Sequence, residues 1–182
     1  MITDPLPRVN VAHLPTPLEP LPRLSAYLKG PKLWVKRDDQ TGLATGGNKA
    51  RKLEFLVADA LAKKADTLIT CGAAQSNHAR QTAAAAAKFG LAGVLVLEGH
   101  SPSTTRGNLL LDHLLGAELV WSGDAPPPER MEAVAQDLRT RGRRPYLIPY
   151  GGSNPIGASA YAAAMEEFLA QCCAGKAGLP RD

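Results

Sequence analysis

The sequence predicts an α/β fold of the doubly wound class, in three layers, with a mostly parallel sheet covered by helices on both faces. Short apolar runs rich in β-branched residues alternate along the chain with helical patterns of ten or more residues, which is typical of successive βαβ units. The composition agrees with a packed domain, because 45% of the 182 residues are hydrophobic and 21% are charged.

The N-terminal part of the chain predicts an arm followed by one strand. Residues 14–24 contain four prolines, and each proline fixes its own backbone and restricts its predecessor, so we expect an extended arm. Residues 32–36 alternate polar and apolar side chains and predict a half-buried strand that ends at Arg37 and Asp38.

The first long helix is expected over residues 49–64. Its apolar residues recur at helical spacing, and Asn48 stands at the N-cap position. A short buried strand over residues 67–71 follows, then a turn at residues 72–74 and an alanine-rich helix that ends at Gly90.

The same unit repeats toward the end of the chain. We expect strands at residues 93–97, 118–121 and 146–149, and helices at residues 104–115 and 128–141 that end at Gly116 and Gly142. Ser153, Asn154 and Pro155 open a last helix, since a capping side chain followed by proline is typical of a helix N-terminus.

Charge and composition exclude several classes of protein. The formal net charge is only +4, and the basic cluster at residues 139–144 lies where a helix ends, so the helix dipole explains it without nucleic acid. No apolar run is long enough for a membrane span, and residues 1–10 carry prolines and Asp4 where a signal peptide has an apolar core. We therefore expect a cytoplasmic protein. The three cysteines match no metal-ligand spacing, so no metal is expected.

Three loops at the expected junctions combine glycine with a polar capping residue. They span residues 45–49, 71–78 and 150–155. Free N–H groups at helix N-termini bind carboxylates and phosphates, and ligands of such sheets gather at the carboxyl ends of the strands. The loops together predict an anion-binding pocket, although each alone is equally well explained as turn and cap chemistry. The chain has no fingerprint for dinucleotides, for nucleoside triphosphates or for a serine hydrolase.

Lys49 stands at the start of a helix, directly after a Gly-Gly pair. The helix dipole disfavours a cation there, and a partly desolvated ammonium loses its proton more easily, which a Schiff-base lysine requires. The alternative is an ordinary surface lysine. Lys52 lies on the same helical face and could reach an anion, whereas Arg51 points elsewhere and is expected to be solvated.

Five stretches, in this order, carry a resemblance to a known family. They are Pro15-Thr16-Pro17-Leu18-Glu19, Lys36-Arg37-Asp38-Asp39, Gly46-Gly47-Asn48-Lys49-Ala50-Arg51-Lys52-Leu53-Glu54-Phe55, residues 65–70 continuing through Gln75-Ser76-Asn77-His78-Ala79-Arg80-Gln81-Thr82, and Ile148-Pro149-Tyr150-Gly151-Gly152-Ser153-Asn154-Pro155. From about residue 14 to residue 169, the chain resembles the D-cysteine desulfhydrase and 1-aminocyclopropane-1-carboxylate deaminase family. This family has the tryptophan-synthase-β-like fold of the fold type II pyridoxal-phosphate enzymes. His78 looks more like the desulfhydrase branch than the deaminase branch, where glutamine is usual.

The resemblance implies pyridoxal 5'-phosphate as cofactor and β-elimination of D-cysteine to pyruvate, hydrogen sulfide and ammonia. Lys49 would hold the cofactor aldehyde and act as the base at the substrate α-carbon. Asn77 would hydrogen-bond the ring hydroxyl oxygen, and Lys52 would help to neutralise the phosphate. Ser76 would hold the substrate carboxylate with the amides of its loop and could relay a proton, and Asn77 and His78 would belong to the same substrate-binding loop.

The resemblance also implies a domain division and an assembly. Residues 1–47 would be the arm and first strand of a larger cofactor domain, residues 48–150 a small α/β domain, and residues 151–182 the start of the return into the larger domain. Family members are nearly twice this length and carry their phosphate-binding loop later, so we expect a truncated first half of an enzyme. The implied partners are a small amino-acid substrate and a second copy in a homodimer. Two alternatives stay open: activity like the deaminase branch, and a non-catalytic fragment.

Overall fold

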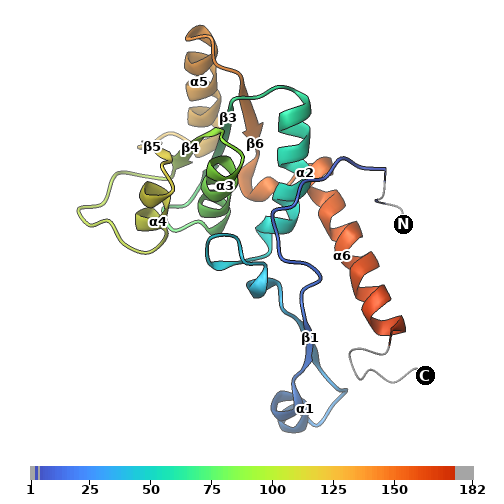
Figure 1. Ribbon diagram of the computed structural model, residues 1–182. Helices are drawn as coiled ribbons and strands as arrows, with labels where there is room; N and C mark the ends of the chain where they lie inside the picture. Colours follow the sequence, from blue (N-terminus) through green and yellow to red (C-terminus); the bar gives the residue numbers. More distant parts are fainter. Residues whose placement is uncertain (1–2, 4, 175–182) are drawn as a thin grey trace.

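The computed structural model describes residue 3 and residues 5–174 (Figure 1). Expectations for residues 1–2 and 4, and for the tail at residues 175–182, lie outside the described residues. No helix in the described part of the chain combines the length and the apolar character of a membrane span.

A four-stranded parallel sheet lies at the centre of the fold and confirms the predicted α/β class. Its order is β5-β4-β3-β6. The strands are β3 (Thr67–Gly72), β4 (Ala92–Leu97), β5 (Glu118–Trp121) and β6 (Pro145–Ile148). The helices that connect them are α3 (Asn77–Lys88), α4 (Asn108–Leu114) and α5 (Pro127–Thr140).

Helices cover both faces of the sheet, as predicted. Alternate residues of β3 point to opposite faces, so Ile69 packs in the cluster that contains Met131 of α5, whereas Leu68 packs against α2 (Lys49–Ala62). Helix α3 lies on the same face as α2, and the long helix α6 (Pro155–Cys173) runs along α2 on its outer side (Figure 1).

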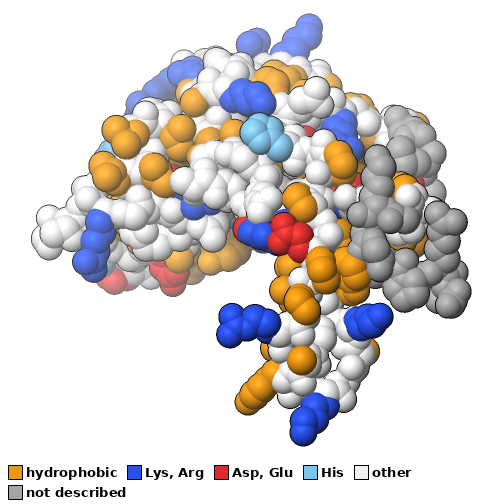
Figure 2. All heavy atoms as spheres, turned by 60° about the horizontal axis from the view of Figure 1, so that its bottom comes forward, with side chains coloured by type: hydrophobic (Ala, Val, Ile, Leu, Met, Phe, Trp, Pro, Cys, Tyr) orange, Lys and Arg blue, Asp and Glu red, His pale blue; other side chains and the backbone are white. Residues whose placement is uncertain are grey.

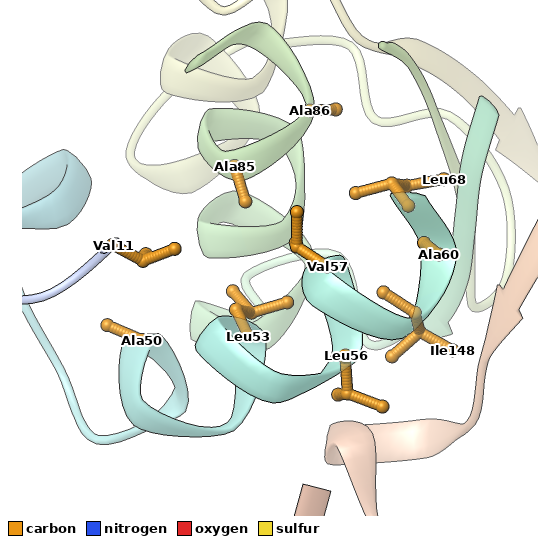
Figure 3. Packing of buried hydrophobic residues seen from close by; sticks show 10 residues of the cluster. All are labelled: Val11, Ala50, Leu53, Leu56, Val57, Ala60, Leu68, Ala85, Ala86 and Ile148. Atoms are coloured by element: carbon orange, nitrogen blue, oxygen red, sulfur yellow. The ribbon is translucent and has the colours of Figure 1, made fainter. Parts of the chain in front are cut away.

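The amphipathic face of α2 forms the centre of the largest core cluster (Figure 3). Leu53, Leu56 and Val57 are fully buried there against Leu68 and Ile148 of the sheet. Burial of each such side chain stabilises the fold by roughly 1.5–3 kcal/mol. The facing side of α3 is built from alanines, which let the two helices approach closely.

The N-terminal arm is more structured than the prolines suggested. Strands β1 (Leu18–Pro20) and β2 (Trp34–Lys36) pair antiparallel, and the helix α1 (Pro22–Leu28) lies between them. Proline is compatible with the first turn of a helix, so Pro22 begins α1 rather than preventing it. This β1–α1–β2 hairpin projects from the body of the molecule (Figure 2).

Two predicted helix starts differ in the structure. The helix expected from residue 104 begins at Asn108, because Gly107 has φ of 60° and cannot be a helical residue. Asn48 does not cap α2, since its own backbone is helical and its side chain instead donates to Tyr161 Oη at 2.9 Å. The caps at Ser76 and Asn154 are real, with distances of 3.2 Å to Ala79 N and 2.8 Å to Gly157 N.

Arg51 is buried, which corrects the expectation that it is a solvated charge. Only 2% of the residue is exposed. Its guanidinium binds Asp38 at 2.8 Å and Glu167 at 3.0 Å. Lys36 also pairs with Glu167, and Thr16 accepts a bond from Arg51. We call these five residues the Arg51 cluster, and it joins the arm, α2 and α6.

Candidate functional site

Two of the three predicted loops meet at the carboxyl edge of the sheet. Strands β3 and β6 are neighbours, with Thr70 opposite Ile148. The turn after β3 leads into α3 at Ser76. The 3-10 turn η3 (Tyr150–Gly152) follows β6 and leads to α6.

The third loop lies against α3 and positions the start of α2. Gly46 O accepts bonds from Arg80 Nη2 at 2.7 Å and from Gln81 Nε2 at 2.5 Å. Thr41 Oγ1 binds both the N–H and the carbonyl of Gly47 at 2.8 Å. A Cβ on Gly46 would lie 1.9 Å from Asp39 O, so this close packing requires glycine.

Lys49 and Lys52 converge on the turn after β6. Lys52 Nζ donates to Gly151 O at 3.1 Å and to Ser153 Oγ at 3.2 Å. A Cβ on Gly151 would lie 3.7 Å from Lys49 Cε, so glycine leaves free space beside that lysine. Burial, and then the charge of Lys49, lower the pKa of Lys52. Among the described residues neither lysine has a carboxylate partner, so the positive charge at this turn is uncompensated.

Asn77 presents its amide nitrogen at the N-terminus of α3. Its Oδ1 accepts from Arg80 Nη1 at 3.1 Å and from Asn108 Nδ2 at 3.0 Å. No bond to Nδ2 is found within the described part of the chain, and the residue is exposed. The side chain is therefore oriented with its donor group outward, beside the amides that Ser76 caps.

His78 lies beneath the site rather than on the loop surface. It is 3% exposed, and a Cβ on Gly152 would lie 3.4 Å from His78 Cε1. Thr70 Oγ1 donates to Ile148 O, so it accepts from His78 Nε2 at 3.0 Å and fixes the tautomer. Burial, helped by the charges of Lys49 and Lys52, lowers the pKa of His78 to about 3. The ring is a neutral support under the turn that Lys52 contacts.

The sequence reasoning missed Arg80, Asn108 and Tyr161. Arg80 contacts the glycine loop, Asn77 and Asn108 together, and Tyr161 Oη receives a bond from Asn48. Arg80 stands three residues after Asn77 in a helix that is otherwise rich in alanine, a spacing that places both side chains on one face. The three-residue spacing from Asn77 was therefore the feature of the sequence that could have indicated Arg80. Asn108 and Tyr161 come from distant segments and gave none.

Comparison of the sequence with known families identifies one match. The family described as pyridoxal-phosphate dependent enzyme matches residues 9–177. The D-cysteine desulfhydrases of Salmonella typhi and Salmonella newport are each 49% identical to the chain over 172 residues, which is 91% of this chain and 52% of theirs. The chain thus spans about half the length of the curated relatives it matches.

Solved structures show the same similarity in three dimensions. A crystal structure described as an ACC deaminase homologue superposes with a TM-score of 0.87 at 43% identity, over 93% of this chain and 52% of that one. Diaminopropionate ammonia lyase from Escherichia coli, in its apo form, has a TM-score of 0.67 at 21% identity, over 92% of this chain and 48% of that one. The second match concerns the fold alone.

Proposed function

The chain belongs to the family of pyridoxal-phosphate dependent enzymes, and from this premise we propose that the protein is a lyase that acts on D-cysteine. The products are pyruvate, hydrogen sulfide and ammonia, with one water consumed. The observation that carries the proposal is that Lys49 and Lys52 lie beside the turn after β6, while Asn77 begins the helix after the neighbouring strand β3 at the same edge of the sheet, in a chain 49% identical to D-cysteine desulfhydrases.

The residues at this edge fit pyridoxal phosphate in their chemistry. Lys49 offers a primary amine for the aldehyde, and Lys52 offers a positive charge that no carboxylate of the described residues balances. Asn77 Nδ2 is a donor without a partner among the described residues, whereas its oxygen is already bound twice. The free amides at the N-terminus of α3 suit a carboxylate. Each polar part of the cofactor and of an amino acid therefore has a matching group.

When bound, pyridoxal phosphate supplies an electron sink for the electron pair released at the substrate α-carbon. Lys49 would hold the aldehyde and, once the substrate amine has replaced it, would accept the α-proton on Nζ. Ser76 and the α3 amides would hold the carboxylate and so orient the α-carbon. Asn77 would donate to the ring hydroxyl oxygen, and Lys52 would offset the phosphate charge.

A second candidate is the reaction of the deaminase branch. The ACC deaminase homologue is 43% identical to this chain and covers nearly all of it, so we keep 1-aminocyclopropane-1-carboxylate as the alternative substrate. A non-catalytic fragment is the third possibility.

The proposal extends to the assembly and its location. We propose a homodimer in the cytoplasm, with residues 48–150 as a small α/β domain. Residues 1–47 and 151–182 would belong to a larger cofactor domain. This division is supported by the Arg51 cluster, in which residues from 1–47 and from 151–182 bind the same arginine on α2, and by the hairpin, which lies away from the sheet in Figure 1.

The test uses the extended protein, by which we mean this chain continued to the length of its relatives. We expect it to turn yellow on addition of pyridoxal phosphate and to release pyruvate and sulfide from D-cysteine. Keto-acid release from 1-aminocyclopropane-1-carboxylate alone would favour the second candidate. A protein that stays colourless and releases no keto acid would contradict both.

A further inference from the structure

We infer that Arg80 is a positioning residue of the proposed site, which holds the Asn77 amide with its NH₂ group outward and fixes it to the loop in front of Lys49. This inference rests on the proposed function. Its basis is a hydrogen-bond network behind the site, centred on a buried arginine that is 6% exposed.

The Arg80 guanidinium joins three segments of the chain. Nη2 donates to Gly46 O at 2.7 Å, two residues before the turn into α2. Nη1 donates to Asn77 Oδ1 at 3.1 Å and to Asn108 Oδ1 at 3.0 Å. One planar group thus sets the spacing between the glycine loop, the N-terminus of α3 and the start of α4.

The acceptors around Arg80 fix which way the Asn77 amide points. Asn108 Nδ2 also donates to Asn77 Oδ1, at 3.0 Å, and to Gln75 O at 2.7 Å. If the Asn77 amide were flipped, its NH₂ would face a guanidinium and a second NH₂, and two bonds would be lost. Hydrogen bonds from a charged donor are about twice as strong as those from a neutral donor, so the bond from Arg80 contributes most to the orientation of the Asn77 amide.

The chemistry of the cofactor explains why this spacing matters. The aldehyde and the hydroxyl of pyridoxal phosphate stand on adjacent ring carbons, so the groups that meet them must be held at a fixed separation. Lys49 follows Gly46 by three residues, and Asn77 stands three residues before Arg80. The rigid Arg80 guanidinium, bonded to both Gly46 and Asn77, can hold the two segments at a fixed separation. A lysine has a single ammonium group and cannot fix that separation in the same way.

Helix α4 also brings a buried carboxyl into the neighbourhood of the Arg80 charge. Asp112 stands one helical turn after Asn108 and is fully buried, and its carboxylate oxygens have no hydrogen-bond partner among the described residues. Burial raises the pKa of the Asp112 carboxyl to about 7, and the nearby Arg80 charge acts on that pKa in the opposite direction. Asn108 and Asp112 therefore present one face of α4 to the same cation.

The first measurement is independent of the cofactor. In the 182-residue chain, NMR of the Asn77 side-chain NH₂ is compared between the wild type, Arg80→Met and the control Arg130→Met, which changes an exposed arginine of α5. We expect the Asn77 signals to shift in Arg80→Met and to stay in place in Arg130→Met. Unchanged Asn77 signals would overturn the inference. If Arg80→Met does not fold, Asn108→Ala replaces it, because it removes the second donor and one acceptor of the same network.

The second measurement is a double-mutant cycle on the affinity of the extended protein for pyridoxal phosphate. We expect Arg80→Met and Asn77→Ala each to weaken binding about tenfold, and the double variant to be no weaker than either single one. Arg80→Lys should not restore the affinity. Additive losses would mean that Arg80 acts only on stability and would overturn the inference. A wild type that binds no cofactor would contradict the proposed function, and the NMR result would still decide on Arg80.

Discussion

Lys49 is the residue on which the proposed chemistry depends. In the extended protein, Lys49→Ala should abolish the visible absorbance of the bound cofactor and lower pyruvate release by at least about 100-fold, since the amine both holds the aldehyde and takes the proton. Its side chain is only half-buried at a junction between loop and helix, so the free energy of unfolding should change by less than about 1 kcal/mol.

The control for Lys49 is Lys32→Ala, which changes an exposed lysine of the projecting hairpin. It should leave absorbance and pyruvate release unchanged. Pyruvate release by Lys49→Ala at the wild-type rate would remove Lys49 from the mechanism.

His78 predicts a pH dependence of stability. Its pKa is about 3 in the folded protein, so the unfolded chain binds a proton below pH 6.5 that the folded chain does not bind. The contribution of the neutral His78 ring to the free energy of unfolding is therefore fully present above pH 6.5 and is lost as the pH falls toward 3. At pH 5 the loss should be about 2 kcal/mol relative to pH 8.

The matched measurement is urea unfolding of the wild type and of His78→Gln at both pH values. Asp112 has an opposite effect, since burial raises its pKa to about 7, but it is common to both proteins and cancels in the difference. An NMR titration in which the His78 ring protonates near pH 6.5 would contradict the prediction.

At this scale the sequence was sufficient where the signal is local. Lys49 and Asn77 stand beside glycine and capping residues, so their positions at loop ends follow from neighbours in the chain. Arg51 was misread because its partners Asp38 and Glu167 are 13 and 116 residues away. A helical pattern contains no information on a partner from another element.

Helix α3 provides a test that separates a cap from a binding group. Ser76→Ala should lower the free energy of unfolding by about 1 kcal/mol, because Ala79 N loses its acceptor. In the extended protein it should also raise KM for D-cysteine and lower kcat, while cofactor affinity stays unchanged.

Asn154→Ala is the matched control, since it removes the equivalent cap of α6 at Gly157 N. Asn154→Ala should lower the free energy of unfolding by a similar amount and leave kcat and KM unchanged. If both variants leave the kinetic constants unchanged, Ser76 is a helix cap only.

The elements themselves were predictable wherever periodicity was strong. The strands of the parallel sheet begin and end within about two residues of the predicted positions, because each is a short apolar run bounded by turns. Helix α1 was not predicted, because the four prolines of the arm indicated an extended segment. The last of them, Pro22, is the first residue of that helix. The late start of α4 depends on the backbone angle at Gly107, which the apolar pattern does not contain.

At the scale of the whole molecule, large apolar side chains are exposed on α6 and on the projecting hairpin, among other places. Met165 and Leu169, four residues apart on α6, are 55% and 54% exposed. Leu24 and Tyr27 are exposed on the projecting hairpin, where hydrophobic side chains are visible in Figure 2. Ala160 and Ala163, on another side of α6, are buried and pack with Phe55.

We expect the 182-residue chain to self-associate through the exposed side of α6. Met165→Lys together with Leu169→Lys should shift sedimentation toward the monomer. Leu114→Lys, which changes a leucine of α4 that is 74% exposed, is the control and should not. A wild-type chain that sediments as a monomer at micromolar concentration would contradict this expectation. The chain alone should also bind pyridoxal phosphate weakly, which the same samples can test by absorbance.

The sequence predicted the succession of elements but not their arrangement in space. That β3 lies between β4 and β6 follows from which strands pair, and each pairing joins residues far apart in the chain. The contact of the arm with α6 has the same origin. The strand order and the contact of the arm with α6 therefore depend on hydrogen bonds and packing between segments that are distant in the sequence.

The Arg51 cluster has a consequence for synthesis on the ribosome. Arg51 and Asp38 emerge almost together, but Glu167 is made 116 residues after Arg51. At about 5–20 residues per second, the arginine therefore waits on the order of ten seconds for its second carboxylate. In that interval the strands of the parallel sheet are synthesised. The hairpin is meanwhile held to α2 by the ion pair between Arg51 and Asp38, without the pair to Glu167. Docking of α6 is thus the step that completes the Arg51 cluster.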